Sequence, residues 1–175
     1  MPTEILDIVD TAVKIGLGAL ISGLATYGVT KLNHDKDIEK SKLKRQRELL
    51  EEIASQTEEF SNVVLKYWAY MVEHVRYVER NKEGPEDLES RIESAARELF
   101  EKFSKLSSAE GKLILLGATK AQELVREYGE YVKDFRRKAW QGNSRLTELE
   151  LESYRTEILS KRKVLYQELR SAYEK

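Results

Sequence analysis

Residues 11–32 read TAVKIGLGALISGLATYGVTKL, an almost uncharged run in a chain in which 35% of the residues are charged. As a helix, these 22 residues would extend about 33 Å at ~1.5 Å per residue, and the hydrocarbon core of a bilayer is roughly 30 Å thick. Lys14 lies near the start of the run, where its long stem can carry the ammonium group to the membrane interface. The run therefore predicts a single transmembrane helix, with the lipid bilayer as its first partner.

The charges on either side of this run predict its orientation. The first ten residues hold three acidic side chains and no Lys or Arg, whereas residues 31–47 hold seven basic side chains and three acidic ones. The basic residues are Lys31, Lys36, Lys40, Lys42, Lys44, Arg45 and Arg47. Because Lys and Arg next to a membrane segment favour the cytoplasmic side, we expect a single-pass protein of the inner (cytoplasmic) membrane with its N-terminus outside. An acidic start also argues against a cleavable signal peptide, whose first residues are basic.

These patterns divide the chain into four parts. Residues 1–10 form a short extracytoplasmic N-terminus, 11–32 the transmembrane helix, 33–47 a basic juxtamembrane segment and 48–175 a cytoplasmic helical bundle. The basic segment has two open interpretations: a topology signal alone, or an added attraction to anionic headgroups of about 1 kcal/mol per Lys or Arg. From residue 48 onward the chain carries 22 basic and 25 acidic residues, and its length suffices for one hydrophobic core.

A long helix is predicted directly after the membrane segment. Neither Gly nor Pro occurs between Gly28 and Gly84, and the residues between them are rich in Glu, Lys, Leu and Arg, all good helix formers. The first bundle helix should therefore cover about 36–82, and it can be continuous with the membrane helix. Its apolar residues recur at helical spacing and predict a core-facing stripe.

Helix-breaking and capping residues in the remaining chain predict three shorter helices. Gly84-Pro85 suits a helix end followed by a helix start, and Ser107–Glu110 and Thr147–Glu150 have the form of capping boxes. The predicted ranges are 85–106, 108–141 and 145–174. Short connections between helices favour antiparallel neighbours. The predicted fold class is therefore all-α, with a single N-terminal transmembrane helix followed by a cytoplasmic up-and-down four-helix bundle.

Small residues follow one another along one side of the membrane segment at spacings of four and three. They are Ala12, Gly16, Ala19, Gly23, Thr26 and Thr30. In lipid, helices associate by close backbone packing, which small residues permit. The stripe predicts a self-associating anchor and hence a homo-oligomer, although Gly and Ala are also common in membrane helices that do not associate.

A pore is an alternative outcome of such association. Asp7 and Asp10 would form an acidic ring at the outer mouth, and Thr26 and Thr30 could line a polar path. In the simpler interpretation the acidic residues only set the orientation, and the threonines pack against a neighbouring helix.

A stripe of polar aromatic side chains lies beside the core stripe of the first bundle helix. Tyr67, Tyr70, His74 and Tyr77 share this face. A helix that is apolar over so wide an arc is either central in its bundle or in contact with another protein. We therefore regard these four residues as a candidate surface for an unidentified protein partner, with core placement as the alternative.

Enzyme, cofactor and nucleic-acid functions find little support in the sequence. The chain has no cysteine and only two histidines, and it lacks the His-Glu-x-x-His, Walker and Gly-x-Ser-x-Gly motifs. We expect a non-enzymatic protein with no catalytic residue, no metal and no cofactor. The basic clusters at 136–138 and 161–163 are flanked by acidic residues, which makes nucleic acid an unlikely partner.

The layout resembles that of small bacterial and prophage-encoded membrane proteins, among them pore-forming accessory proteins of RNA-targeting CRISPR systems, whose soluble part is similar to the four-helix HEPN domain. The resemblance is one of architecture and carries no motif. The HEPN nuclease signature, an Arg four to six residues ahead of a His, is absent before both His34 and His74, which excludes RNase activity by that route.

Two functions follow from these patterns. The first is a membrane-anchored helical bundle that self-associates and acts as an interaction or scaffold module. The alternative is an oligomeric pore or membrane-perturbing effector of a bacterial defence or phage-related system.

Overall fold

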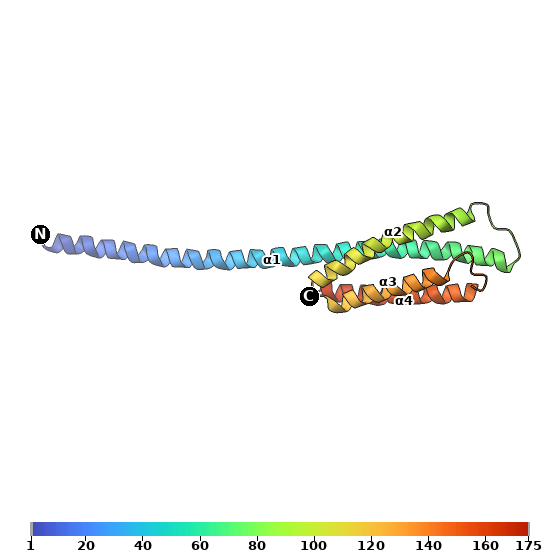
Figure 1. Cartoon of the computed structure of the whole chain (residues 1–175). Helices are drawn as coiled ribbons and strands as arrows, with labels where there is room; N and C mark the ends of the chain where they lie inside the picture. Colours follow the sequence, from blue (N-terminus) through green and yellow to red (C-terminus); the bar gives the residue numbers. More distant parts are fainter. Residues whose placement is uncertain (1, 175) are drawn as a thin grey trace. The chain divides into compact units, whose positions relative to one another are not determined.

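The computed structural model describes the backbone of residues 2–174 and the side chains of residues 22, 26, 27, 29–31, 34 and 36–174. This part of the chain contains four helices and no strand (Figure 1). The helices are α1 (Pro2–Glu79), α2 (Leu88–Leu115), α3 (Thr119–Lys138) and α4 (Glu148–Tyr173). The all-α fold class is thus confirmed.

The chain forms two compact units, of which the first ends at Arg45 and the second begins at Gln46. α1 contributes residues to both units and is helical without interruption through 33–35. Among the described side chains, no helix offers a segment that is both long and apolar enough to cross a membrane. Most of Thr11–Leu32 lies outside those side chains, so the transmembrane helix stays a prediction.

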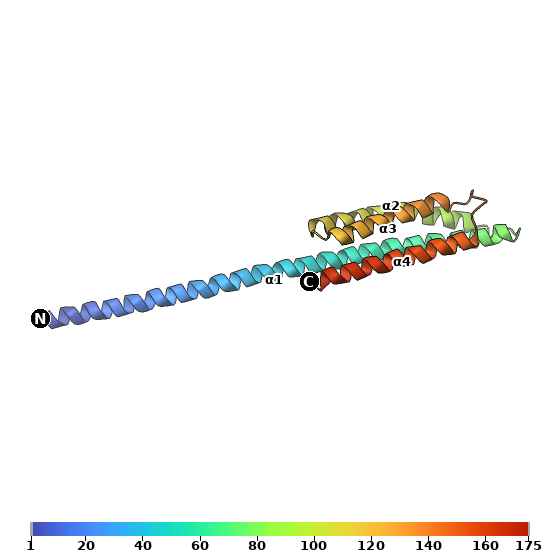
Figure 2. The ribbon, with the colours of Figure 1, turned by 90° about the horizontal axis from the view of Figure 1, so that it is seen from below.

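The second unit is an up-and-down bundle of four helices. Glu52 and Glu73 of α1 pair with Lys112 and Arg91 of α2, so residues early in one helix meet residues late in the other. The pair of Lys120 on α3 with Glu168 near the end of α4 shows the same antiparallel relation. Figures 1 and 2 together show α1 beside α2 in one view and beside α4 in the other. Each helix of the bundle is therefore antiparallel to its neighbours in sequence.

α1 supplies the centre of the core because it contacts all three other helices. Its buried apolar side chains are Leu50, Ile53, Phe60, Val63, Val64, Tyr67, Met71, Val72 and Val75. The ring of Phe60 makes edge contacts with Phe103 of α2 at 4.9 Å and Tyr128 of α3 at 5.7 Å between centroids. Trp68 donates from its indole nitrogen to the carbonyl oxygen of Leu151 in α4, at 2.7 Å. The wide apolar arc of α1 is thus filled by contacts within the chain.

A ladder of ion pairs follows the seam between α1 and α2. Residues 52, 59, 66 and 73 of α1 are seven apart, and each pairs with a residue of α2. The pairs are Glu52–Lys112 at 2.5 Å, Glu59–Lys102 at 2.8 Å, Lys66–Glu98 at 2.9 Å and Glu73–Arg91 at 3.2 Å. Exposed pairs of this kind each contribute roughly 0–1 kcal/mol. Because the pairs recur at regular spacing, they favour the observed register of α2 along α1; a shift of α2 by one helical turn would break them.

The boundary between the second and third helices differs from the prediction. α2 does not end at Leu106 but continues to Leu115, since Ala109 and Leu113 extend its buried face. The break comes at Gly117, whose φ is +67°. The amide of Gly117 donates to Ile114 and that of Ala118 to Leu113, the paired bonds of a Schellman motif. Helix continuity through the serines is thus favoured by burial on the opposite face.

The other boundaries show one motif confirmed and two ends moved. At Thr147 the hydroxyl accepts from the amide of Glu150, and the Glu150 carboxylate accepts from the amide of Thr147, so the predicted capping box is present. α3 ends at Lys138 instead of residue 141. The backbone leaves the helical conformation of α1 at Asn81, whose φ is 49°, and not at Gly84, which packs under the ring of Tyr77.

Gly117 and Gly111 form a matched pair for testing the new boundary. No atom lies within 4 Å of a Cβ built on either residue, so replacement by Ala changes only backbone preferences. We expect Gly117→Ala to lower the free energy of unfolding by about 1–2 kcal/mol, because a left-handed φ is costly for a residue with a Cβ. Gly111→Ala should raise it by roughly 0.5–1 kcal/mol, because Ala favours the helix. Urea denaturation measures both, and a stabilising Gly117→Ala would contradict the boundary.

Candidate functional site

The four residues predicted as a partner surface do not share an exposed face. Tyr67 is 1% exposed, its hydroxyl donates to the carbonyl oxygen of Ala139, and its ring makes an edge contact with Phe135. Burial raises the pKa of the Tyr67 hydroxyl, and the nearby Arg136 opposes this shift. Tyr67 therefore belongs to the core. The partner-surface prediction is corrected for this residue, because α1 is covered on that side by α3 and the loop after it.

The other three residues of this set are half-buried and lie toward α2 and the loops. The guanidinium of Arg91 covers the ring of Tyr70 at 5.0 Å. Nε2 of His74 lies 3.3 Å from the carbonyl oxygen of Gln141. The ring of Tyr77 would lie 3.3 Å from a Cβ at Gly84. Tyr77 also lines an open groove along α1, and His74 and Tyr77 both line a second groove against the loop before α2.

The groove along α1 is the candidate functional site, and its volume is about 510 Å³. Its lining residues are Trp68, Ala69, Val72, Glu73, Arg76, Tyr77, Arg80 and Lys82. The hydrogen bond to Leu151 holds the indole of Trp68 in place, and the guanidinium of Arg155 lies over the same indole at 5.0 Å. The floor is therefore aromatic and positioned by packing. A groove of this size can hold one large apolar side chain of a partner.

The charges around the groove include two cations, Arg80 and Lys82, in the residues that follow α1. Arg76 donates to the Glu148 carboxylate at 2.9 Å. This hydrogen bond and the positive charge of Arg76 hold the pKa of Glu148 below its usual value, and the charge of Arg80 lowers it further. Glu73 is paired with Arg91. Within the described part of the chain, no carboxylate lies within ion-pair distance of Arg80 or Lys82. The groove can thus receive an apolar side chain flanked by acidic groups.

Sequence patterns alone did not single out Trp68, Arg80 and Lys82 as a group. Helical spacing alone places Trp68 in the apolar stripe of α1, and the two basic residues follow the end of α1, where cations are ordinary. The signal that could have found Arg80 is its helical spacing from the exposed Ala69 and Arg76, next to Trp68; no spacing indicates Lys82.

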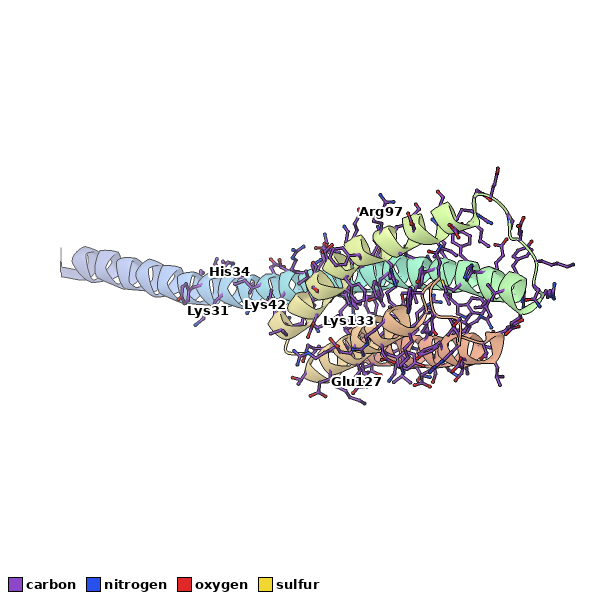
Figure 3. The ribbon with its side chains drawn as sticks, turned by 45° about the vertical axis from the view of Figure 1, so that its right-hand side comes forward. Lys31, His34, Lys42, Arg97, Glu127 and Lys133 are labelled. Atoms are coloured by element: carbon purple, nitrogen blue, oxygen red, sulfur yellow. The ribbon has the colours of Figure 1, made fainter. Side chains whose placement is uncertain are left out.

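The predicted membrane-associated residues fall into two groups. The juxtamembrane basic residues are exposed along α1, as are Thr26 and Thr30; Figure 3 labels Lys31, His34 and Lys42 on this stretch. The side chains of Asp7, Asp10, Ala12, Gly16, Ala19 and Gly23 lie outside those that the structure describes. Neither the small-residue face nor the pore mouth is tested.

Polar side chains are also buried between α1, α3 and α4. The Tyr128 hydroxyl donates to Ser61 Oγ at 2.9 Å, and Ser61 Oγ donates to the carbonyl oxygen of Thr57 at 2.8 Å. The Tyr166 hydroxyl lies 3.0 Å from both the Ala54 carbonyl oxygen and Oε2 of Glu58. Burial raises the pKa of Tyr128 to about 12 and is also the main cause that raises the pKa of Tyr166 to about 12. These bonds satisfy the polar groups of the core and so have a structural role.

No metal-binding cluster is found in the part of the chain that is described. Its side chains include no group of three or more His, Cys, Asp or Glu residues placed to hold a metal ion. Comparison with protein families, with curated proteins and with solved structures finds no match for this chain.

The buried tyrosines predict a loss of stability at alkaline pH. Their folded pKa values of about 12 exceed the reference value of 10.0, so the folded state holds these protons more tightly. The free energy of unfolding should be level between about pH 7 and 9 and fall between about pH 10 and 12, by up to ~1.4 kcal/mol per pH unit for a fully buried tyrosine.

Tyr128→Phe separates the two contributions of this residue. Near neutral pH it should cost about 1 kcal/mol through the lost hydrogen bond, and above pH 10 its decline should be shallower than that of the unmodified chain. Urea denaturation at several pH values measures this, and parallel declines for the two proteins would contradict the assignment.

Proposed function

We propose that this protein is a non-enzymatic, membrane-anchored helical bundle that self-associates and serves as an interaction or scaffold module. The anchor is the run Thr11–Leu32, and the module is the bundle that begins at Gln46. The observation that supports the proposal most strongly is the uninterrupted course of α1, from Pro2 to Glu79, through an apolar run as long as a bilayer core is thick.

Two further features support the interaction role. The groove beside Trp68 offers a positioned aromatic floor and is lined by Arg80 and Lys82, which suits a protein segment with an apolar side chain between acidic ones. The small-residue face of the anchor is of the kind by which membrane helices associate. Together they favour a protein that gathers copies of itself and a partner at the membrane.

The anchor is tested by placing charge in the middle of the run. We expect the pair Leu20→Arg and Leu24→Arg to move the protein from the membrane fraction to the soluble fraction, because each Arg at a helix centre costs about 3 kcal/mol of insertion free energy. The matched control is Ser41→Arg with Leu43→Arg, in the exposed basic segment, which should leave the protein in membranes. Carbonate extraction of cell membranes measures both. An unmodified protein that is fully extracted would overturn the anchor.

Self-association through the anchor is tested at its glycines. Gly16→Leu with Gly23→Leu should convert detergent-solubilised oligomers to monomers, because the larger side chains keep the helix backbones apart. Leu17→Ile with Leu24→Ile, on the other side of the helix, should leave the oligomers intact. Size-exclusion chromatography with light scattering distinguishes these outcomes, and unchanged oligomers in the glycine variant would contradict the role of this face. Membrane depolarisation on induced expression of the unmodified protein would instead indicate the pore.

A further inference from the structure

The outward side of α2 exposes large apolar side chains. Phe100 is 80% exposed and Leu115 84% exposed, and Ile114 beside them is 59% exposed. Single exposed apolar residues are common, but these follow one helix side. Phe100, Ser104, Ser108, Gly111 and Leu115 succeed one another at spacings of four, four, three and four. We call this set the neutral face of α2.

The neutral face lacks the charges that cover the rest of the bundle. Between Arg97 and Leu115 no charged residue occupies this strip of α2, and Glu101 and Lys105 lie to one side of it. On α3, by contrast, every exposed residue except Thr119 is charged. Figure 3 shows Arg97 on the outward side of α2 and the charged residues Glu127 and Lys133 on α3. The neutral face is therefore an uncharged strip in a chain in which 35% of the residues are charged.

We propose that the neutral face of α2 pairs with the same face of a second copy, in parallel orientation, when the two copies are anchored in one membrane. This inference rests on the proposed membrane anchor. It places a second contact between copies in the bundle, separate from the small-residue face of the anchor.

The chemistry of the face suits an identical copy better than a different partner. A parallel pair related by a two-fold axis sets each residue near its own counterpart, so any charge on the axis would meet a like charge. The neutral face has none. A serine can donate to and accept from another serine, which lets Ser104 and Ser108 pair with their counterparts. An acidic or basic partner would find no complementary charge there.

The shape of the face permits close approach. A Cβ built on Gly111 would meet no atom within 4 Å, so the backbone there is open to a neighbour. Small residues at 104, 108 and 111 allow two helices to come close, while Phe100 and Leu115 at the two ends supply the apolar area. The neutral face, from Phe100 to Leu115, extends about 22 Å at ~1.5 Å per residue.

The extent of the face explains why tethering matters. One helix face falls short of the roughly 800 Å² per partner that a stable free dimer buries, so untethered copies should pair weakly. Anchoring in one membrane raises the effective concentration of copies. It also attaches both copies to the membrane by the same end of the chain, as a parallel pair requires.

The absence of cysteine from the chain allows a direct test by disulfide formation. Full-length variants carry one substitution each: Ser104→Cys, Ser108→Cys or Gly111→Cys on the neutral face, and Glu123→Cys or Glu130→Cys on α3 as controls. Disulfides need Cα atoms about 4.4–6.8 Å apart. After mild oxidation of cell membranes, we expect the neutral-face variants to form cross-linked dimers at least tenfold more than the α3 variants.

A charge variant separates pairing from chance collision. Phe100→Glu with Leu115→Glu, in the Ser108→Cys background, places like charges opposite each other and should reduce the dimer yield at least tenfold. Both residues are exposed, so the helical circular dichroism should stay unchanged. Glu127→Gln in the same background is the control and should leave the yield unchanged.

The outcomes separate this inference from the anchor proposal. Membrane-bound protein whose neutral-face cysteines cross-link no more than those of α3 overturns the pairing and leaves the anchor intact. Protein found in the soluble fraction overturns the anchor and the tethered pairing with it. Cross-linking that survives the two glutamates overturns the assignment to this face.

Discussion

The apolar arc of α1 is wider than one neighbouring helix can cover, and the bundle is built around covering it. Phe60 alone contacts rings from α2 and α3, and Trp68 is held by the backbone of α4. Because each buried large side chain contributes roughly 1.5–3 kcal/mol, this shared burial outweighs the exposed ion pairs, which contribute less than about 1 kcal/mol each. Those pairs set the register of α2 against α1 rather than the existence of the fold.

The same packing decides which surfaces remain for interaction. Tyr67 is covered by α3 and the following loop and is therefore removed from the surface. Arg80 and Lys82, just after the end of α1, line the groove beside Trp68. On α2, burial uses one side of the helix and leaves the neutral face outward. The groove and the neutral face lie on different helices, so a bound partner and a second copy would not compete for the same residues.

The two proposed contacts between copies would act together. A small-residue face in the membrane and a neutral helix face in the bundle are each modest, but linked contacts gain from effective concentration. An anchor and a bundle that both self-associate would make assembly depend on the amount of protein in the membrane, which is a fitting property for a scaffold.

The fold class, the capping box at Thr147 and the existence of one very long helix were determined by the sequence, because helix propensity, the absence of Gly and Pro, and short-range side-chain to backbone bonds act within a few residues. Tertiary packing decided the rest. Ser107 and Ser108 lie mid-helix because Ala109 and Leu113 gain burial on the opposite side, and the chain turns instead at Gly117, where a left-handed φ is tolerated. Likewise, Tyr67 lies in the core and Val78 is 51% exposed, although both follow helical spacing. Periodicity places residues on a face, but only the neighbouring helices determine how far along the helix that face is covered.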